Sequence, residues 1–275
     1  VQQLQLLYLH KGYVQAKIDH PVISLAPDRR SLALLVRIHE GPRYNVGKVD
    51  VEMTDGEWLV PREELLALSS FEEGEVFDYM KIRQDEQALG DAFRDRGYAN
   101  AHVASDYRPN EETQIVDFVY RIQKGQLVHI GRIDIRGNRS TRDKVIRREL
   151  KISEGDLYSA SKLRRSQQRV QALGFFDKVA VTPRTGRQSD RMDVSIDVSE
   201  QNTGTFQVGA GFSSYEKFLL TATISKENFL GRGQSLSAQA TLSALRKMFS
   251  VSFFEPYFLD SRWTFAFDVF NFAEN

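Results

Sequence analysis

The sequence predicts tandem α+β modules with the element order β-α-α-β-β, followed by the antiparallel strands of a transmembrane β-barrel fragment. Three observations predict this fold class. A short motif recurs about every 80 residues, each repeat contains a helix-spaced stripe of apolar residues, and the C-terminal quarter alternates between apolar and small polar residues. A repeat of this length has the size of a small domain and is too long for a solenoid unit.

The recurring motif is a helix end, a glycine, an aromatic residue and then a strand. It occurs at Gly12-Tyr13, at Gly97-Tyr98 and at Gly174-Phe175. Glycine suits this position because a left-handed φ closes the last helical turn without a side-chain clash. We therefore expect each of these glycines to end a helix and to lead into a strand.

The middle module contains all five elements of the repeat. Its first strand is expected at 44–53, and Pro61 opens a short helix in a position where proline is tolerated. Asp78 begins a longer helix after the break at Glu73-Gly74. The last two strands are expected at about 98–107 and 113–122, where apolar residues alternate with polar ones.

The next module repeats this order. Ile133 and Ile135 mark its first strand, and a capping box of Ser140 and Asp143 is expected to start its short helix. Its long helix carries an apolar stripe, and its last two strands are expected at about 176–183 and 192–198. The two modules are thus predicted to share one fold.

The repeats divide the chain into four expected parts. We expect the C-terminal part of a module in 1–41, complete modules in 42–125 and 126–203, and about five strands of a truncated barrel in 204–275. The first part supplies only one helix and two strands. The sequence is therefore expected to begin inside a module.

Residues 205–272 alternate between two kinds of side chain. One phase is apolar, as in Phe218, Leu220, Ala222 and Ile224, and the other is made of small neutral residues. Because successive side chains of a strand point to opposite faces, one face of the sheet is apolar. Such a sheet suits a barrel wall between lipid and a wet lumen. The pattern leaves open a soluble β-sandwich, in which the apolar face turns inward.

The charges are unevenly distributed. The chain has 37 basic and 37 acidic residues, of which only six of each lie in 204–275. The formal net charge of zero gives the chain as a whole no attraction to nucleic acid or to anionic lipid, so we expect no nucleic-acid partner. No apolar run reaches the ~20 residues of a transmembrane helix. The absence of cysteine excludes disulfides and thiolate metal sites.

No catalytic or cofactor-binding pattern is found. The five histidines, at positions 10, 20, 39, 102 and 129, lack the spacing of metal ligands. Gly209-Ala210-Gly211 matches half of a dinucleotide-binding fingerprint, but it lies in an expected strand and no helix follows. We therefore expect no catalytic residue, no metal and no cofactor.

Three segments resemble the BamA family of outer-membrane β-barrel assembly factors, whose periplasmic modules are called POTRA domains. The segments are Ala-Leu-Gly-Phe-Phe-Asp-Lys-Val at 172–179, Asn-Phe-Leu-Gly-Arg-Gly-Gln at 228–234, and Phe-Phe-Glu-Pro-Tyr-Phe-Leu-Asp at 253–260. The resemblance covers nearly the whole chain. It implies that 1–203 are periplasmic POTRA domains and that 204–275 lie in the outer membrane of a Gram-negative bacterium.

The resemblance also implies a function and its partners. The function would be the insertion and folding of outer-membrane proteins, and the partners would be unfolded outer-membrane proteins, accessory outer-membrane lipoproteins and the lipid bilayer. A closed barrel needs at least ~8 strands, so the chain is expected to be part of a longer protein. Two alternatives are a POTRA-barrel secretion pore of the two-partner type, which passes one exported substrate, and a soluble periplasmic adaptor.

Client binding is expected at the edges of the module sheets. The strands near 98–107 and 176–183 are the expected edges, and a nascent strand would add there by main-chain hydrogen bonds. The residues expected at these edges are Val103, Val179 and Val181. The alternative is an edge protected from pairing by Lys178, Pro183 and Arg108.

The resemblance assigns two further sites. It makes the first barrel strand the seam of the barrel, with Phe206, Val208, Gly209 and Gly211, and we hypothesise that the two glycines keep this seam openable. It places Arg147 and Glu154 where the last POTRA domain meets an accessory lipoprotein. For the basic segment 142–148 that contains Arg147, a solvated helix face is the alternative.

Overall fold

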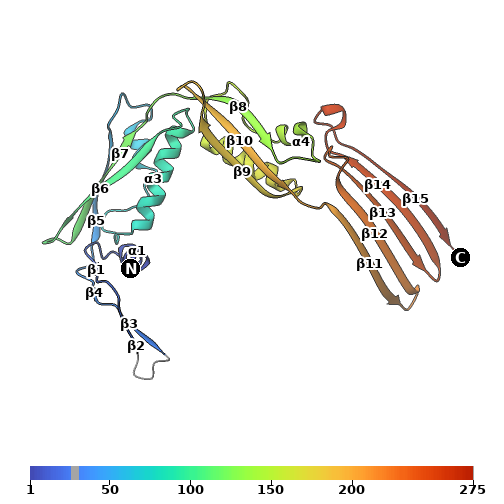
Figure 1. Ribbon diagram of the computed structural model, residues 1–275, viewed down its shortest axis with the longest axis horizontal. Coiled ribbons are helices and arrows are strands. Elements are labelled where there is room, and N and C mark those ends of the chain that lie inside the picture. The colour runs from blue at the N-terminus through green and yellow to red at the C-terminus, as the bar shows by residue number, and fades with distance from the viewer. Residues whose placement is uncertain (26–30, 275) are drawn as a thin grey trace. The chain divides into compact units, whose positions relative to one another are not determined.

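The computed structural model describes residues 1–25 and 31–274, which form two compact units (Figure 1). Unit 1 contains Val1–Val128 together with Tyr158–Ala160. Unit 2 contains His129–Leu157 and the chain from Ser161 onward. Within the described residues, no helix has the length and apolar character needed to span a bilayer.

Unit 1 begins with a helix and two short strand pairs. Helix α1 (Gln2–His10) buries none of its residues. Strand β1 (Lys17–Ile18) pairs with β4 (Ile38–His39), and β2 (Val22–Leu25) pairs with β3 (Leu32–Leu35). The expected helix is present, but the described residues form four short strands where two were expected. Most of the connection between β2 and β3 lies outside the described residues.

The middle module of unit 1 has the predicted order of elements. They are β5 (Asn45–Met53), α2 (Arg62–Leu66), α3 (Tyr79–Arg94), β6 (His102–Asn110) and β7 (Ile115–Gln123). The sheet order is β5-β7-β6, with β7 parallel to β5 and antiparallel to β6. Apolar residues of α3, of the sheet and of the segment before α3 form one core, which includes Phe77, Ile82, Leu89, Phe93 and Phe118.

Unit 2 begins with a second copy of this module. Its elements are β8 (His129–Arg136), α4 (Asp143–Arg147), α5 (Ala160–Ala172), β9 (Phe176–Thr185) and β10 (Arg191–Glu200). The sheet order β8-β10-β9 repeats that of the first copy. Gly12, Gly97 and Gly174 all have a positive φ, of 90°, 101° and 73°, which confirms the role predicted for the recurring glycine.

The predicted capping box at the start of α4 is wrong. The residue that precedes this helix is Arg142, and no side chain caps the first turn. The backbone N–H of Ser140 donates to the carboxylate of Glu200, at 3.0 Å, so the segment before the helix is held by the end of β10. A partner 60 residues away thus replaces the local one that the motif predicted.

The two long helices each bury one polar residue at the same place. Asp85 of α3 accepts a hydrogen bond from the N–H of Ser70, at 3.0 Å. Ser166 of α5 accepts one from the N–H of Lys151, at 2.8 Å. Both amides follow the short helix of their module, where the chain leaves regular structure. Each module therefore uses a buried side chain to satisfy a backbone donor that would otherwise be unpaired.

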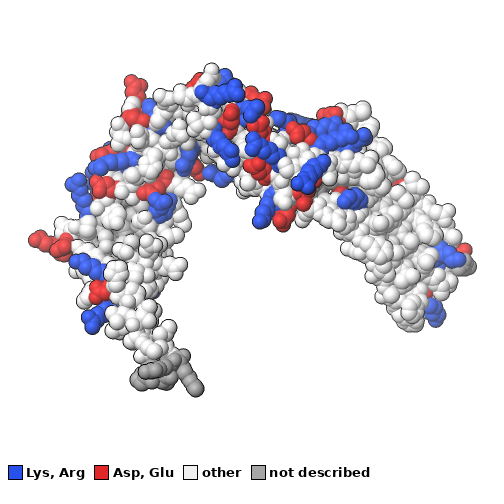
Figure 2. Space-filling model, in the orientation of Figure 1, with Lys and Arg blue, Asp and Glu red and all other residues white. Residues whose placement is uncertain are grey.

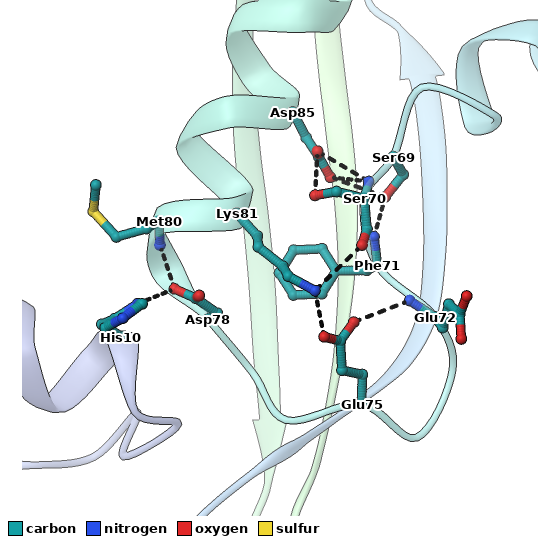
Figure 3. Close-up of polar contacts among 10 residues, drawn as sticks. All are labelled: His10, Ser69, Ser70, Phe71, Glu72, Glu75, Asp78, Met80, Lys81 and Asp85. Carbon is teal, nitrogen blue, oxygen red and sulfur yellow. Dashed lines mark hydrogen bonds and ion pairs between the residues drawn. The ribbon is translucent and has the colours of Figure 1, made fainter.

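Figure 3 shows this network in the middle module. The Asp85 carboxylate also accepts from the hydroxyls of Ser69 and Ser70. It accepts as well from the hydroxyl of the buried Tyr120, at 2.9 Å, which the figure does not draw. Burial and the neighbouring Asp85 carboxylate raise the pKa of Tyr120, which keeps its phenol protonated. Lys81, one turn before Asp85 in α3, forms an ion pair with the Glu75 carboxylate. Asp85 and Lys81 thus hold the loop between α2 and α3 at two points.

The start of α3 follows the sequence prediction. The Asp78 side chain caps the helix by accepting from the N–H of Met80, at 2.8 Å. It also lies 2.7 Å from Nδ1 of His10, so the end of α1 is tied to the start of α3 (Figure 3). This contact joins the N-terminal segment to the middle module of unit 1.

The chain then forms a five-stranded antiparallel sheet. Its strands pair in sequence order: β11 (Gly204–Ser213), β12 (Lys217–Phe229), β13 (Gln234–Ser243), β14 (Arg246–Glu255) and β15 (Phe265–Glu274). A short 3-10 helix, η1 (Phe258–Asp260), lies between the last two strands. The predicted number of strands is confirmed. The sheet is open, because β11 and β15 do not pair with each other.

The sheet has one apolar face. In the register, Leu220 lies opposite Leu242, Ala222 opposite Ala240 and Ile224 opposite Ala238, so the apolar phases of neighbouring strands coincide. Phe206 and Phe218 are each 70% exposed, and within residues 1–25 and 31–274 no second sheet covers this face. The arrangement is that of a barrel wall and lacks the second layer of a sandwich. Figure 2 shows charged side chains at the ends of these strands and few on the broad face between them.

We predict that Asp85→Ala strongly destabilises the middle module. The variant removes the acceptor of the part-buried hydrogen bond from the Ser70 N–H and leaves the buried Tyr120 hydroxyl without Asp85; an unsatisfied buried group costs about 1–3 kcal/mol. Hydrogen exchange measured by mass spectrometry should show faster exchange across α3 and Ser69–Phe71. The control is Glu73→Ala, which removes an exposed carboxylate from the same module. Equal exchange in the two variants would contradict the role assigned to Asp85.

Candidate functional sites: exposed strand edges and the module–sheet junction

Each module sheet has an edge strand where the sequence predicted one. Among residues 1–25 and 31–274, strand β6 pairs only with β7, and β9 pairs only with β10. The side chains of Val103 and Val179 are buried in the module cores, and that of Val181 is half-buried. These residues can therefore contact a partner strand mainly through their backbone N–H and C=O groups.

A proline shows which backbone groups face outward. Pro109 lies opposite Val116 in the first sheet, and Pro183 lies opposite Val194 in the second. Proline has no N–H to donate to the neighbouring strand, so its place in a ladder is one where the backbone faces away. Residues two and four positions earlier share this direction. In β9 these residues are Val181 and Val179.

Side chains from the long helices occupy part of both edges. Glu86 of α3 accepts from the Ser105 N–H, at 3.0 Å, and from its hydroxyl, at 2.8 Å. Gln167 of α5 donates to the carbonyl oxygen of Val179, at 2.8 Å. In the described part of the chain, the outward backbone groups of Val181 have no such side-chain partner. The protected edge considered from the sequence is thus partly realised, by Pro183 as considered and by Glu86 and Gln167, which were not considered.

Sequence reasoning missed both of these edge contacts. Glu86 and Gln167 each come directly after the buried polar residue of their helix, Asp85 or Ser166. Aligning the two repeats would have shown a pair of polar side chains at the same helical position. The shared position indicates that Glu86 and Gln167 have the same role in the two modules.

The predicted seam strand β11 pairs along its whole length with β12, from Gly204 opposite Lys226 to Ser213 opposite Lys217. Its other edge meets no strand among the described residues. Phe206 and Val208 are strongly exposed. A Cβ added at Gly209 or Gly211 would meet no atom within 4 Å, so close packing does not require glycine there. That these glycines keep the seam openable remains a hypothesis about strand pairing.

The structure brings Arg147 and Glu154 together. Their side chains lie 3.8 Å apart, measured from Nη1 to Oε1, and both are about half exposed. Each also binds the backbone of Ile133: Arg147 donates to its carbonyl at 2.9 Å, and Glu154 accepts from its N–H at 3.0 Å. The pair forms one surface feature beside β8. Its docking of an accessory protein remains a prediction.

The last module contacts the turn between β12 and β13. Nδ2 of Asn228 donates to the hydroxyl oxygen of Thr141, at 2.7 Å, and both residues are buried. The N–H of Arg142 donates to the carbonyl of Gly231, at 2.9 Å. Gly231 has a φ of +68°, and a Cβ there would lie 1.9 Å from the Ser140 carbonyl oxygen. Only glycine allows this close approach.

Glu200 supports the same contact from inside the module. Its carboxylate accepts from the N–H groups of Ser140 and Thr141, at 3.0 and 2.6 Å. Burial alone would raise the pKa of Glu200, but these hydrogen bonds outweigh burial and hold the pKa below its usual value. An ionised Glu200 therefore positions the loop that binds Asn228.

The segment after β14 makes a second contact with the module. The Tyr257 hydroxyl donates to Oε1 of Glu149, at 3.0 Å, and the guanidinium of Arg148 lies 4.1 Å from the centre of the Tyr257 ring. Lys144 of α4 forms an ion pair with Asp260, at 2.8 Å. The segments 228–234 and 253–260, which carry the family resemblance, therefore build one module–sheet junction. Their resemblance was visible in the sequence, but this role was not.

The described residues contain no group of three or more His, Asp or Glu side chains placed to hold a metal ion. The candidate functional features described above are strand edges, an apolar face and the junction. They can bind other chains and lipid through hydrogen bonds and apolar contact.

Comparisons with known proteins match this architecture. The profile of the POTRA family, described as the surface antigen variable number repeat, matches residues 44–125 and 128–201. The Omp85 superfamily domain matches residues 228–275. The chain is 33% identical over 266 residues to the outer membrane protein assembly factor BamA of Nitratidesulfovibrio vulgaris, and 32% identical over 265 residues to that of Neisseria meningitidis serogroup B. These matches cover 95% and 96% of this chain and 33% of each relative, so the chain spans about a third of their length.

Solved structures show the same fold. BamA from Haemophilus ducreyi lacking POTRA domains 1–3 matches with a TM-score of 0.75 and 27% identity, covering 83% of this chain and 43% of that one. The POTRA3-5 segment of BamA from Haemophilus influenzae matches with a TM-score of 0.65 and 22% identity, covering 72% of this chain and 78% of that one. The chain belongs to the BamA family of outer membrane protein assembly factors, with POTRA domains that lead into the first strands of an Omp85 barrel.

Proposed function

We propose that the whole protein inserts and folds outer-membrane proteins. The relatives that match 95% of the chain are named as assembly factors. The observation that carries the proposal is β11, the first strand of a sheet with an exposed apolar face, whose outer edge is unpaired in the described structure. The sheet would lie in the outer membrane and the POTRA domains in the periplasm.

The POTRA edges would receive unfolded client proteins first. A client strand that adds beside β9 would form hydrogen bonds with the backbone of Val181 and with the N–H of Val179. A client strand that adds beside β6 would lie next to the backbone of Val103. Main-chain pairing tolerates many client sequences, which an assembly factor with diverse clients requires. Gln167 and Glu86 would have to release the edge as the client strand pairs.

The strand β11 would then act as a template for the client. An unpaired backbone group costs several kcal/mol in hydrocarbon, so a client strand gains most by pairing before it meets lipid. Phe206 and Val208 continue the lipid-facing side next to the incoming strand. The assembly step forms hydrogen bonds and buries apolar surface, and it needs neither bond chemistry nor a nucleotide.

The Arg147–Glu154 pair would be the docking point for an accessory outer-membrane lipoprotein. Both side chains are half exposed and are held in place by the backbone of Ile133. A preformed pair of opposite charges suits a polar partner surface.

We predict that Val181→Pro weakens client binding at the POTRA edge. The change removes an outward N–H from β9, whereas the control Val181→Ala shortens the same side chain and keeps that N–H. Photo-crosslinking of an unfolded outer-membrane protein to the full-length protein should fall for the proline variant only. Equal crosslinking in both variants, with normal hydrogen exchange in β10, would contradict client pairing at this edge.

We also predict a position-specific disulfide at the seam. The chain has no cysteine, so Val208→Cys adds a single thiol to β11, and Ala240→Cys adds one to the interior strand β13 on the same face. A client with one cysteine in its terminal strand should crosslink to position 208 during assembly and not to position 240. Equal crosslinking at the two positions, or none at 208 while assembly proceeds, would contradict the template role of β11.

A further inference from the structure

The module–sheet junction contains a pocket of about 300 Å³ that four basic side chains line. Arg142, Lys144 and Arg148 come from the last POTRA domain, and Arg232 comes from the turn between β12 and β13. Two carboxylates, Glu255 and Asp260, complete the charged lining. The pocket therefore has two more positive than negative side chains.

The acidic residues of the pocket are already engaged. Asp260 is paired with Lys144, at 2.8 Å. Glu255 accepts from the Gln234 side chain, at 2.5 Å, and from the Tyr257 N–H, at 3.0 Å. Within residues 1–25 and 31–274, Arg142 and Arg232 have no carboxylate partner. Two guanidinium groups at the pocket are thus available to an anion.

Arg148 adds a further unpaired donor at the pocket. Its guanidinium stacks on the Tyr257 ring, which holds the side chain in place. Its Nε is buried and has no hydrogen-bond acceptor in the described structure. A buried donor without a partner is rare in folded proteins and often marks a bound ion or water.

The pocket directly continues the apolar face of the sheet. Leu236 and Phe253 lie opposite each other on the apolar face of the sheet. Gln234 and Glu255 are each two residues further along their strands, so their side chains lie on the same face. The residues that follow β14 include the strongly exposed Leu259 and Trp263, as well as Phe258. Exposed aromatic residues at the ends of barrel strands mark the level of the lipid headgroups. The pocket therefore lies where the apolar band gives way to headgroups.

We propose that this pocket binds the phosphodiester of an anionic glycerophospholipid in the leaflet that borders the periplasm. Arginine suits this ligand because its planar fork of N–H donors matches two phosphate oxygens. The net positive lining favours an anionic headgroup over a zwitterionic one. The bound lipid would bridge Arg142 of the POTRA domain and Arg232 of the sheet. This inference rests on the proposed membrane function.

The test compares two charge-matched double variants of the full-length protein. Arg142→Gln with Arg232→Gln removes the two unpaired arginines, and Arg184→Gln with Arg187→Gln removes two arginines at the far end of β9. Each protein is placed in phosphatidylcholine nanodiscs that contain phosphatidylglycerol. Native mass spectrometry then counts the phosphatidylglycerol molecules that stay bound to the protein when it is released from the nanodisc. Each basic residue near an anionic surface contributes about 1 kcal/mol of attraction. Loss of each pocket arginine should therefore weaken lipid retention about fivefold.

The result expected is a loss of retained phosphatidylglycerol in the pocket variant only, with unchanged hydrogen exchange at Ser140 and Thr141. Equal retention in the two variants would overturn the proposal. So would displacement of the lipid by millimolar inorganic phosphate, because the site would then recognise free phosphate. Membrane insertion is scored separately by incorporation into the nanodisc. Failure of the unchanged protein to insert would reject the proposed function itself.

Discussion

A strand in a membrane must pair its backbone on both sides, because hydrocarbon offers no partner for an N–H or C=O group. Most of the structure follows from this constraint. The sheet β11–β15 can present an apolar face to lipid only if its strands pair along their length, as β11 does with β12 over ten residues. In the described residues the outer edges of β11 and β15 are unpaired, so each is an edge to which a further strand can add. An assembly factor that offers such an edge to a client uses the same requirement that holds its own barrel together.

The junction explains how the sheet is linked to the module before it. Asn228 lies near the end of β12, and Gly231 and Tyr257 lie between strands, yet their partners Thr141, Arg142 and Glu149 belong to the POTRA domain. Glu200 holds the same loop through charged hydrogen bonds, which are stronger than neutral ones. The segments 228–234 and 253–260 therefore serve the contact between two architectures as well as the turns in which they lie.

Much of the fold could be predicted from the sequence because its signals are periodic and local. The glycine at the helix ends, the apolar stripe and the alternating strands each depend on neighbours only a few residues away. The module edges β6 and β9 also followed from the element order. The failures involve distant partners. The predicted capping box at Ser140 does not form, and the Ser140 N–H donates to Glu200 instead. The edge contacts of Glu86 and Gln167 join a helix to a strand of the same module. Aligning the two repeats marks Glu86 and Gln167 as a pair of polar residues, but the sequence does not show which backbone groups they contact.

The most direct test concerns the two faces of the sheet in a bilayer. Single cysteines at Leu220 and Ala238, and at their neighbours Thr221 and Gln239, would carry spin labels in the full-length protein. The account predicts that labels at 220 and 238 are relaxed by oxygen dissolved in lipid, whereas labels at 221 and 239 are relaxed by a water-soluble paramagnetic complex. Labels at 220 and 238 that neither agent reaches would place this face in a dry protein interior and contradict the account.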